Sequence, residues 1–312
     1  MRSQAESLMR LCRARPGATR LFRTRSVAVT SGKGGVGKTN IAANLAIALR
    51  RLRKNVMLVD MDLGLANVDV LLGLHPRWNL RNVIVGDMPL QKIVLDGPGG
   101  IKVVPAGSGA QELSHLAPWQ RQRLADSFAS LEYDFDVAIV DTASGLTDDV
   151  LDFVLASNEA IIVTTPDPAA LTDAYAMIKT IAIRTGMVDP EQPPDRGTPP
   201  RRCPVDLKLF VNMAGSPAEA QAAVDRIRLV ARKFLRVEID DFGYMLADED
   251  VPAAARRQEA FVLSQPEGAA ARSIAALAGR VSANNRIGNA ARGLGSFFGR
   301  LAEAGPQAAT AE

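Results

Sequence analysis

Along this chain, short apolar runs rich in β-branched residues alternate with longer segments whose apolar positions recur at helical spacing. The short runs predict six buried strands: Ser26–Thr30, Val56–Asp60, Ile101–Pro105, Val137–Asp141, Ala160–Thr165 and Leu207–Asn212. The longer segments predict five helices: Lys38–Arg53, Pro118–Leu131, Thr147–Ser157, Pro168–Arg184 and Pro217–Leu235. Strand and helix in alternation predict an α/β fold, with a mostly parallel twisted sheet and helices on both faces.

Three segments depart from this alternation. Residues 1–25 hold seven arginines and a single acid, Glu6, which favours a basic arm that docks on a partner; a mitochondrial transit peptide is the alternative. Residues 189–204 carry too many prolines for helix or sheet and predict a surface insertion within a domain spanning 26–284. Residues 285–304 predict an amphipathic helix, and residues 305–312 a disordered tail.

The composition narrows the class of protein. The 312 residues are 47% hydrophobic with a formal charge of +3, which fits one large α/β domain with appendages. No apolar stretch approaches the ~18 residues that span a bilayer. The two cysteines, Cys12 and Cys203, exclude a disulfide framework and favour a reducing, cytosolic compartment.

A glycine-rich loop joins the first predicted strand to the first predicted helix. Gly32, Gly37, Lys38 and Thr39 match G-x-x-x-x-G-K-[ST] in the strand–loop–helix context that this phosphate-binding motif requires. Lys38 is expected to reach the β- and γ-phosphates of ATP, and the Thr39 hydroxyl to ligate Mg²⁺. The predicted nucleotide-binding residues of this loop are Gly32, Lys33, Gly34, Gly35, Val36, Gly37, Lys38, Thr39 and Asn40.

Lys33 is a second lysine in a loop that Lys38 already serves. A lysine near the start of the loop can point outward, toward the nucleotide of a second copy, where it would stabilise developing negative charge as an arginine finger does. The simpler alternative is a solvated surface lysine.

The string "GKGGVGKT" resembles the deviant phosphate loop of the MinD/ParA ATPases, and the resemblance covers roughly Ser26 to Arg280. It implies a face-to-face homodimer that closes on ATP, with Lys33 acting in trans, and slow, Mg²⁺-dependent hydrolysis of ATP to ADP and phosphate.

Carboxylates end two of the predicted strands. Asp60 and Asp62 stand two residues apart, so both are expected on one face at a carboxyl end of the sheet, where ligands bind in such folds. The resemblance implies that Asp60 and Asp141 belong to the Mg²⁺ site and that Asp62 orients the attacking water. It also implies that Asn212 contacts adenine, a satisfied helix cap being the alternative; it does not choose among residues 248–250.

The C-terminal segment is predicted to bind a membrane surface. On a helical wheel of about 100° per residue, the apolar residues of Arg286–Ala304 fall within an arc of roughly 120°, with arginines opposite. Such a stripe is typical of an interfacial helix; a helix docked on its own domain is the alternative. The residues predicted to enter lipid are Ile287, Leu294, Phe297, Phe298 and Leu301.

Other segments resemble one branch of the family. Val59–Leu80 and Thr164–Ile181 are similar to the flagellar number and placement regulators FlhG (FleN, YlxH). These begin with a D-Q-A-x-x-L-R pattern that stimulates the GTPase FlhF; here Gln4, Ala5 and Leu8 match, whereas Ser3 and Met9 depart from it.

That branch implies an FlhF-type GTPase and flagellar basal-body components as partners. It also implies a cytoplasmic protein, peripheral on the inner face of the cell membrane. The alternative is a ParA-like chromosome or plasmid partition ATPase that binds DNA through its arginines, with an affinity that falls steeply with salt. Nucleic acid is the less favoured partner, and iron–sulfur carriers of this fold need cysteine pairs that this chain lacks.

Overall fold

One twisted sheet forms the centre of the molecule. The computed structural model describes residues 24–284 apart from 87, 108–116, 132–133 and 192–198. In this part of the chain the sheet has eight strands in the order β10-β8-β6-β1-β5-β2-β4-β3. The strands are β1 (Arg25–Ser31), β2 (Val56–Met61), β3 (Leu95–Asp96), β4 (Lys102–Val104), β5 (Val137–Ser144), β6 (Glu159–Thr164), β8 (Asp206–Ala214) and β10 (Asp240–Leu246). All pairs are parallel except β3–β4, which confirms the predicted fold class.

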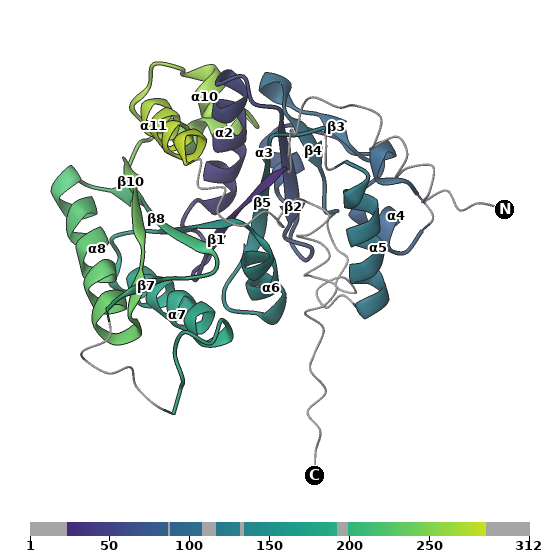
Figure 1. Ribbon diagram of the computed structural model, residues 1–312. Coiled ribbons are helices and arrows are strands. Elements are labelled where there is room, and N and C mark those ends of the chain that lie inside the picture. Colours follow the sequence, from purple (N-terminus) through teal and green to yellow (C-terminus); the bar gives the residue numbers. More distant parts are fainter. Residues whose placement is uncertain (1–23, 87, 108–116, 132–133, 192–198, 285–312) are drawn as a thin grey trace, which may run out of the picture.

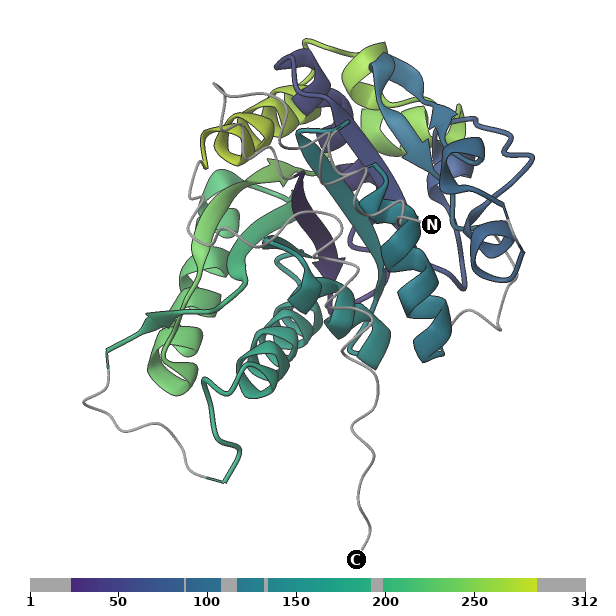
Figure 2. The same ribbon diagram turned by 45° about the vertical axis from the view of Figure 1, so that its right-hand side comes forward.

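Helices cover both faces of this sheet (Figure 1). One face carries α2 (Lys38–Arg51), α10 (Phe261–Ser264) and α11 (Ala269–Ala283). The other carries α4 (Leu80–Ile84), α5 (Pro118–Ala129), α6 (Asp148–Ala156), α7 (Pro168–Arg184) and α8 (Pro217–Val230). Figure 2 shows the sheet between these two layers. The short helices α3 (Val68–Leu71) and α9 (Asp250–Arg256) follow β2 and β10.

Burial on both faces explains the strand sequences. Val27 and Val29 of β1 pack into the core beneath α2 and α11, whereas Ala28 between them faces α6 and α7. Successive residues thus face opposite helical layers, so central strands are continuous apolar runs with no polar alternation. This pattern is what made the six central strands visible in the sequence.

Several elements differ from their predicted bounds. Arg25, grouped with the basic arm because of its charge, opens β1. The α-helix predicted to reach Leu235 ends at Val230 and continues as a π-helical turn over Ala231–Leu235. Inside the predicted proline-rich loop, β7 (Arg201–Arg202) pairs with β9 (Val237–Glu238).

Because the central strands are parallel, all their carboxyl ends lie together on one side of the sheet and all their amino ends on the opposite side. We call the edge where β1, β2, β5, β6 and β8 end the carboxyl edge, and the edge where they begin the amino edge. In the described part of the chain, every helix is too short or too polar to span a bilayer.

Candidate nucleotide-binding site

The phosphate loop lies at the carboxyl edge, between β1 and α2. Gly35 and Gly37 have φ angles of 80° and 84°, a left-handed conformation that residues with a Cβ rarely adopt. A Cβ on Gly32 would lie 2.4 Å from the carbonyl oxygen of Asp173 in α7, so this glycine lets the loop pack directly on that helix. The loop therefore has the strand–turn–helix setting predicted for a phosphate cradle.

Lys38 and Asp141 form a buried ion pair at the floor of this loop. The Lys38 Nζ lies 2.8 Å from Asp141 Oδ1, and both side chains are buried. Burial raises the pKa of Asp141, while the charge and hydrogen bond of Lys38 and a hydrogen bond from Thr39 act in the opposite direction. Two predicted site residues, one at the start of α2 and one in β5, are thus in direct contact although 103 positions separate them.

Asp60 lies beside Asp141, because β2 pairs with β5 in a register that sets these two residues opposite each other. Its carboxylate accepts hydrogen bonds from the backbone N–H groups of Asp62, Asn67 and Val68, at 3.0, 3.2 and 3.3 Å. Burial, followed by the charge of Asp141, nevertheless raises the pKa of Asp60 to about 8. Asp62 follows the end of β2, is half-buried, and accepts a hydrogen bond from the Leu65 N–H.

This donor set fits Mg²⁺ that arrives with a nucleotide. Within the described residues, no group of three or more His, Cys, Asp or Glu side chains forms a metal cage. Mg²⁺ prefers oxygen ligands and commonly combines one or two carboxylates with waters and substrate phosphates. Two adjacent buried carboxylates, one with a pKa of about 8, are groups whose charge a divalent cation would favour.

Lys33 is placed differently from Lys38. Its Nζ lies 3.1 Å from Asp167 Oδ1, and the two side chains are 42% and 53% exposed. Asp167 is the N-cap of α7 and accepts from the Ala169 and Ala170 N–H groups. The Ala170 hydrogen bond and then that of Lys33 lower the pKa of Asp167.

Asp167 was not singled out in the sequence. An Asp followed by Pro at the start of an apolar helical pattern is, however, a typical helix start, and it could have identified this residue.

Asn212 of β8 supports the phosphate loop from the side. Its Nδ2 donates to the Val36 carbonyl at 2.8 Å, and a Cβ on Gly37 would lie 2.4 Å from that nitrogen. Asn212 does not cap a helix, since Ser216 caps α8. The next residue, Met213, has a φ of 55° and is 46% exposed beside Gly37; it was missed in the sequence. A contact of Asn212 with adenine stays a prediction.

Of the remaining predicted residues outside the phosphate loop, those at 248–250 lie within the described part of the chain and the others do not. Asp248 accepts hydrogen bonds from the N–H groups of Asp250 and Ala270, so it ties the start of α9 to α11. The predicted GTPase-stimulating and lipid-binding residues lie outside the described residues: Gln4, Ala5, Leu8, Ile287, Leu294, Phe297, Phe298 and Leu301.

Comparison with known proteins decides the family. The ParA family model, described as NUBPL iron-transfer P-loop NTPase, matches residues 23–188. The antiactivator FleN of Pseudomonas aeruginosa is 41% identical over 255 residues, covering 82% of this chain and 85% of FleN. The chain belongs to the MinD/ParA family of P-loop NTPases. The flagellum site-determining protein YlxH of Helicobacter pylori is a further relative of this MinD/ParA protein, 32% identical over 285 residues, which cover 89% of this chain and 90% of YlxH.

The solved structures of the MinD/ParA family agree on the fold. MinD of Pyrococcus horikoshii, in complex with Mg-ADP, matches with a TM-score of 0.66 and 23% identity, over 85% of this chain and 98% of that one. The resemblance to this family and to its FleN/YlxH branch is therefore confirmed. The iron-transfer role in the family description has no cysteine pair to support it in this MinD/ParA chain.

Proposed function

We propose that this chain is an Mg²⁺-dependent ATPase switch that dimerises on ATP, associates with the membrane and regulates the number and placement of flagella. The observation that carries the proposal is the different setting of the two loop lysines. Lys38 is buried on Asp141 within its own site, whereas Lys33 is exposed and turned to Asp167. Its exposure supports a role for Lys33 at a site outside its own chain, once it has left Asp167.

Each residue of the site has a distinct part in this proposal. The backbone N–H groups of the loop and the Lys38 ammonium bind the phosphates. Thr39, Asp60 and Asp141 would hold Mg²⁺, and Asp62 would orient the attacking water. When bound, Mg²⁺ supplies charge neutralisation for the transferred phosphoryl group. Because this reaction requires mainly positioned water and charge balance, three carboxylates and two lysines suffice for slow hydrolysis.

Lys33 has to leave Asp167 before it can act in trans. Exposed ion pairs are weak and readily exchange with solvent or other charges. A triphosphate brought close by a second copy carries several negative charges and outcompetes one exposed carboxylate. In the closed dimer each Lys33 would therefore exchange Asp167 for the phosphates bound by the other copy.

The cellular role rests on the relatives and on the segments beyond the described residues. FleN is named an antiactivator and YlxH a flagellum site-determining protein. The N-terminal pattern with Gln4, Ala5 and Leu8 supports an FlhF-type GTPase as partner. The apolar stripe of residues 285–304 supports peripheral attachment to the inner face of the cell membrane, with basal-body components as further partners.

The in-trans role of Lys33 has a direct test. Lys33→Ala should bind ATP almost as the wild type does, because Lys38 and the loop amides are intact, but it should lose dimerisation and hydrolysis. Nucleotide titration measures ATP binding, and phosphate release measures hydrolysis. Dimerisation is measured by light scattering with ATP, in an Asp62→Ala background that is deficient in hydrolysis. Equal hydrolysis by Lys33→Ala and wild type contradicts the proposal.

Asp167→Asn is the matched control, since asparagine still caps α7 but carries no charge for Lys33. It should dimerise at an ATP concentration equal to or lower than that required by the wild type. If Asp167→Asn instead behaves like Lys33→Ala, Asp167 holds Lys33 in its active position and the exchange described above is wrong.

A further inference from the structure

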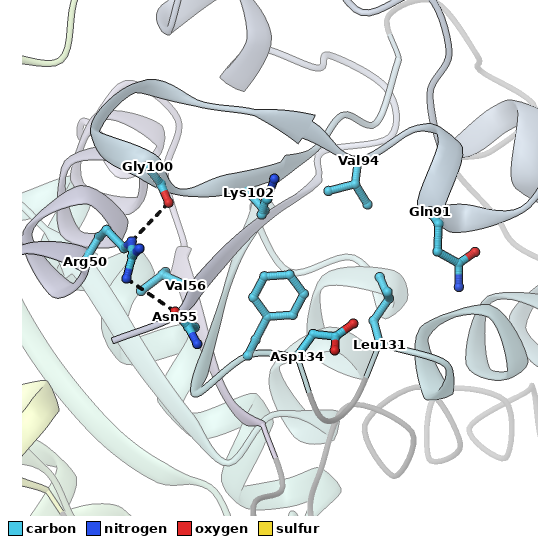
Figure 3. Close-up of a pocket in the computed structure, with 10 residues that line it drawn as sticks. Arg50, Asn55, Val56, Gln91, Val94, Gly100, Lys102, Leu131 and Asp134 are labelled. Carbon is cyan, nitrogen blue, oxygen red and sulfur yellow. Dashed lines mark hydrogen bonds between the residues drawn. The ribbon is translucent and has the colours of Figure 1, made fainter. Parts of the chain in front are cut away.

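A cavity of about 430 Å³ opens at the amino edge of the sheet, the edge opposite the phosphate loop (Figure 3). It lies between the end of α2, the start of β2, the turn before β4 and the segment before β5. Its apolar lining consists of Val56, Val94, Leu131 and Phe135. The volume falls in the range of about 300–1,000 Å³ typical of ligand sites.

Four polar side chains of the cavity lining, Arg50, Asn55, Lys102 and Gln91, have partners within the chain. Arg50 Nε donates to the Gly100 carbonyl at 3.2 Å, and its Nη1 donates to Asn55 Oδ1 at 3.3 Å, as Figure 3 shows. Lys102 pairs with Asp96, and Gln91 Nε2 donates to Ser130 Oγ at 2.6 Å. The cations are thus engaged within the chain, whereas Asp134 adds an exposed carboxylate to the otherwise apolar and paired lining. With its cations paired and a carboxylate present, the cavity suits an apolar side chain better than an anionic small molecule.

The described chain begins directly beside this cavity. Thr24 is fully buried, and its hydroxyl donates to the carbonyl of Phe135, a lining residue, at 2.9 Å. Arg25 N–H donates to the Asp136 carbonyl at 3.0 Å. The segment of 23 residues that precedes Thr24 is therefore joined to the described chain beside the cavity. Two of its residues nearest to Thr24 are the apolar pair Leu21 and Phe22.

The distances allow this pair to reach the cavity. Neighbouring strands lie about 4.8 Å apart, and β5 separates β1 from β2, so the start of β2 is about 10 Å from β1. An extended residue spans at most about 3.3–3.6 Å, which puts the backbone of Phe22 within about 7 Å of Thr24. The length of the phenylalanine side chain covers the remaining distance.

We propose that Leu21 and Phe22 of the chain's own N-terminal segment occupy this cavity. Their attachment two residues from its wall makes docking intramolecular, with a high effective concentration and a very short loop to close. An apolar residue from a separate protein would have to compete with this tethered pair. Docking would hold the basic arm, with Gln4, Ala5 and Leu8, at the amino edge and away from the phosphate loop.

The proposal can be tested by cross-linking in the full-length protein with Cys12→Ser. Arg20→Cys leaves Leu21 and Phe22 intact and is combined with Gln91→Cys at the cavity rim. The matched control combines Arg20→Cys with Gln221→Cys, an equally exposed glutamine on α8. Both pairs are treated with a short bismaleimide, and the intramolecular product is quantified by intact mass.

The Gln91 pair should cross-link several-fold more than the Gln221 pair, and adding Phe22→Ser should remove most of that excess. Circular dichroism and ATP binding should be unchanged, since Phe22 lies outside the nucleotide site. An excess that persists with Phe22→Ser reflects tether length alone and overturns the proposal. Products that join two chains would assign the cavity to a second copy, and this too overturns docking of the chain's own segment.

Discussion

At the scale of single residues, the acids of the site differ sharply in their surroundings. Asp60 is fully buried next to Asp141, whereas Asp62, two positions later, is half-buried at the mouth of the site. The same side chain therefore has different chemistry at the two positions. Burial and a neighbouring charge suit Asp60 to a cation, and partial exposure suits Asp62 to a water molecule.

The raised pKa of Asp60 predicts a pH effect on stability. Between about 4, its ordinary value, and about 8, the native carboxyl holds a proton that the unfolded chain has lost. Unfolding then releases a proton, so the free energy of unfolding of the nucleotide-free protein should fall as the pH rises through this window.

Asp60→Asn removes the titrating group and is the control for this effect. Urea denaturation of both proteins from pH 5 to pH 8 should show the wild type losing stability relative to Asp60→Asn as the pH rises. Mg-ATP binding should also release protons, visible in calorimetry as a dependence of the heat on the buffer. A constant stability difference across this range would contradict the assigned pKa.

At the scale of elements, a buried ionic cluster joins three strands to the end of α11. The Lys208 Nζ of β8 is fully buried, 2.7 Å from Glu159 Oε2 of β6, and Arg25 of β1 pairs with the same carboxylate. Arg25 also donates to the Val281 carbonyl, and Asn284 donates to Glu159. The start of the sheet and the end of the last described helix are therefore held by one carboxylate.

Glu159→Gln should be destabilising, by up to about 3–5 kcal/mol, because the buried Lys208 loses its nearer carboxylate and keeps only Asp206 Oδ2 at 3.6 Å. The double variant Glu159→Gln/Lys208→Met removes both charges and should recover much of the loss. The midpoint and slope of urea unfolding give these values, and the single Lys208→Met variant completes the cycle. Additive losses would show that the two side chains are not coupled.

The sequence predicted the central elements well and the peripheral ones poorly. Strands buried on both faces are continuous apolar runs, and α7 was predicted with its observed bounds. β10 was missed because "DDFGYML" opens with two acids and contains a glycine, which an edge strand tolerates. α11 lies in an alanine-rich stretch, whose small side chains mark a buried face only weakly.

The same contrast holds in the site. The placement of the phosphate loop and of Asp60, Asp62 and Asp141 at one end of the sheet was predictable, because the loop motif follows a strand and the acids lie near the carboxyl ends of parallel strands. The pairing of Lys33 with Asp167 was not, since 134 positions separate the two residues and only the packing of α7 on the loop joins them.

At the scale of the whole molecule, the amino and carboxyl edges of the sheet have separate uses. The phosphate loop and its acids lie at the carboxyl edge, while Thr24 and Asn284, where the described chain begins and ends, lie at the amino edge. A membrane-bound C-terminal segment would thus leave the nucleotide face open to a second copy. Attachment and dimerisation then need not compete.

Deleting residues 285–312 should abolish ATP-dependent sedimentation with anionic vesicles while leaving ATP hydrolysis measurable. Phe297→Ser/Phe298→Ser in the full-length chain should have the same effect if, as proposed, the apolar stripe supplies the lipid affinity. Sedimentation with ATP, with ADP and with a DNA competitor separates this outcome from a partition ATPase. Unchanged sedimentation of the deleted chain would exclude the segment as the membrane anchor.

The position of Arg25 also bears on how this protein can be shortened. A truncation that starts at Ser26, where the charge pattern suggests that the arm ends, would discard the guanidinium that holds Glu159 and Val281. It would also remove the Thr24 hydroxyl from Phe135. A truncation that starts one or two residues before Thr24 keeps both interactions, so the effect of losing the arm can be measured on an intact domain.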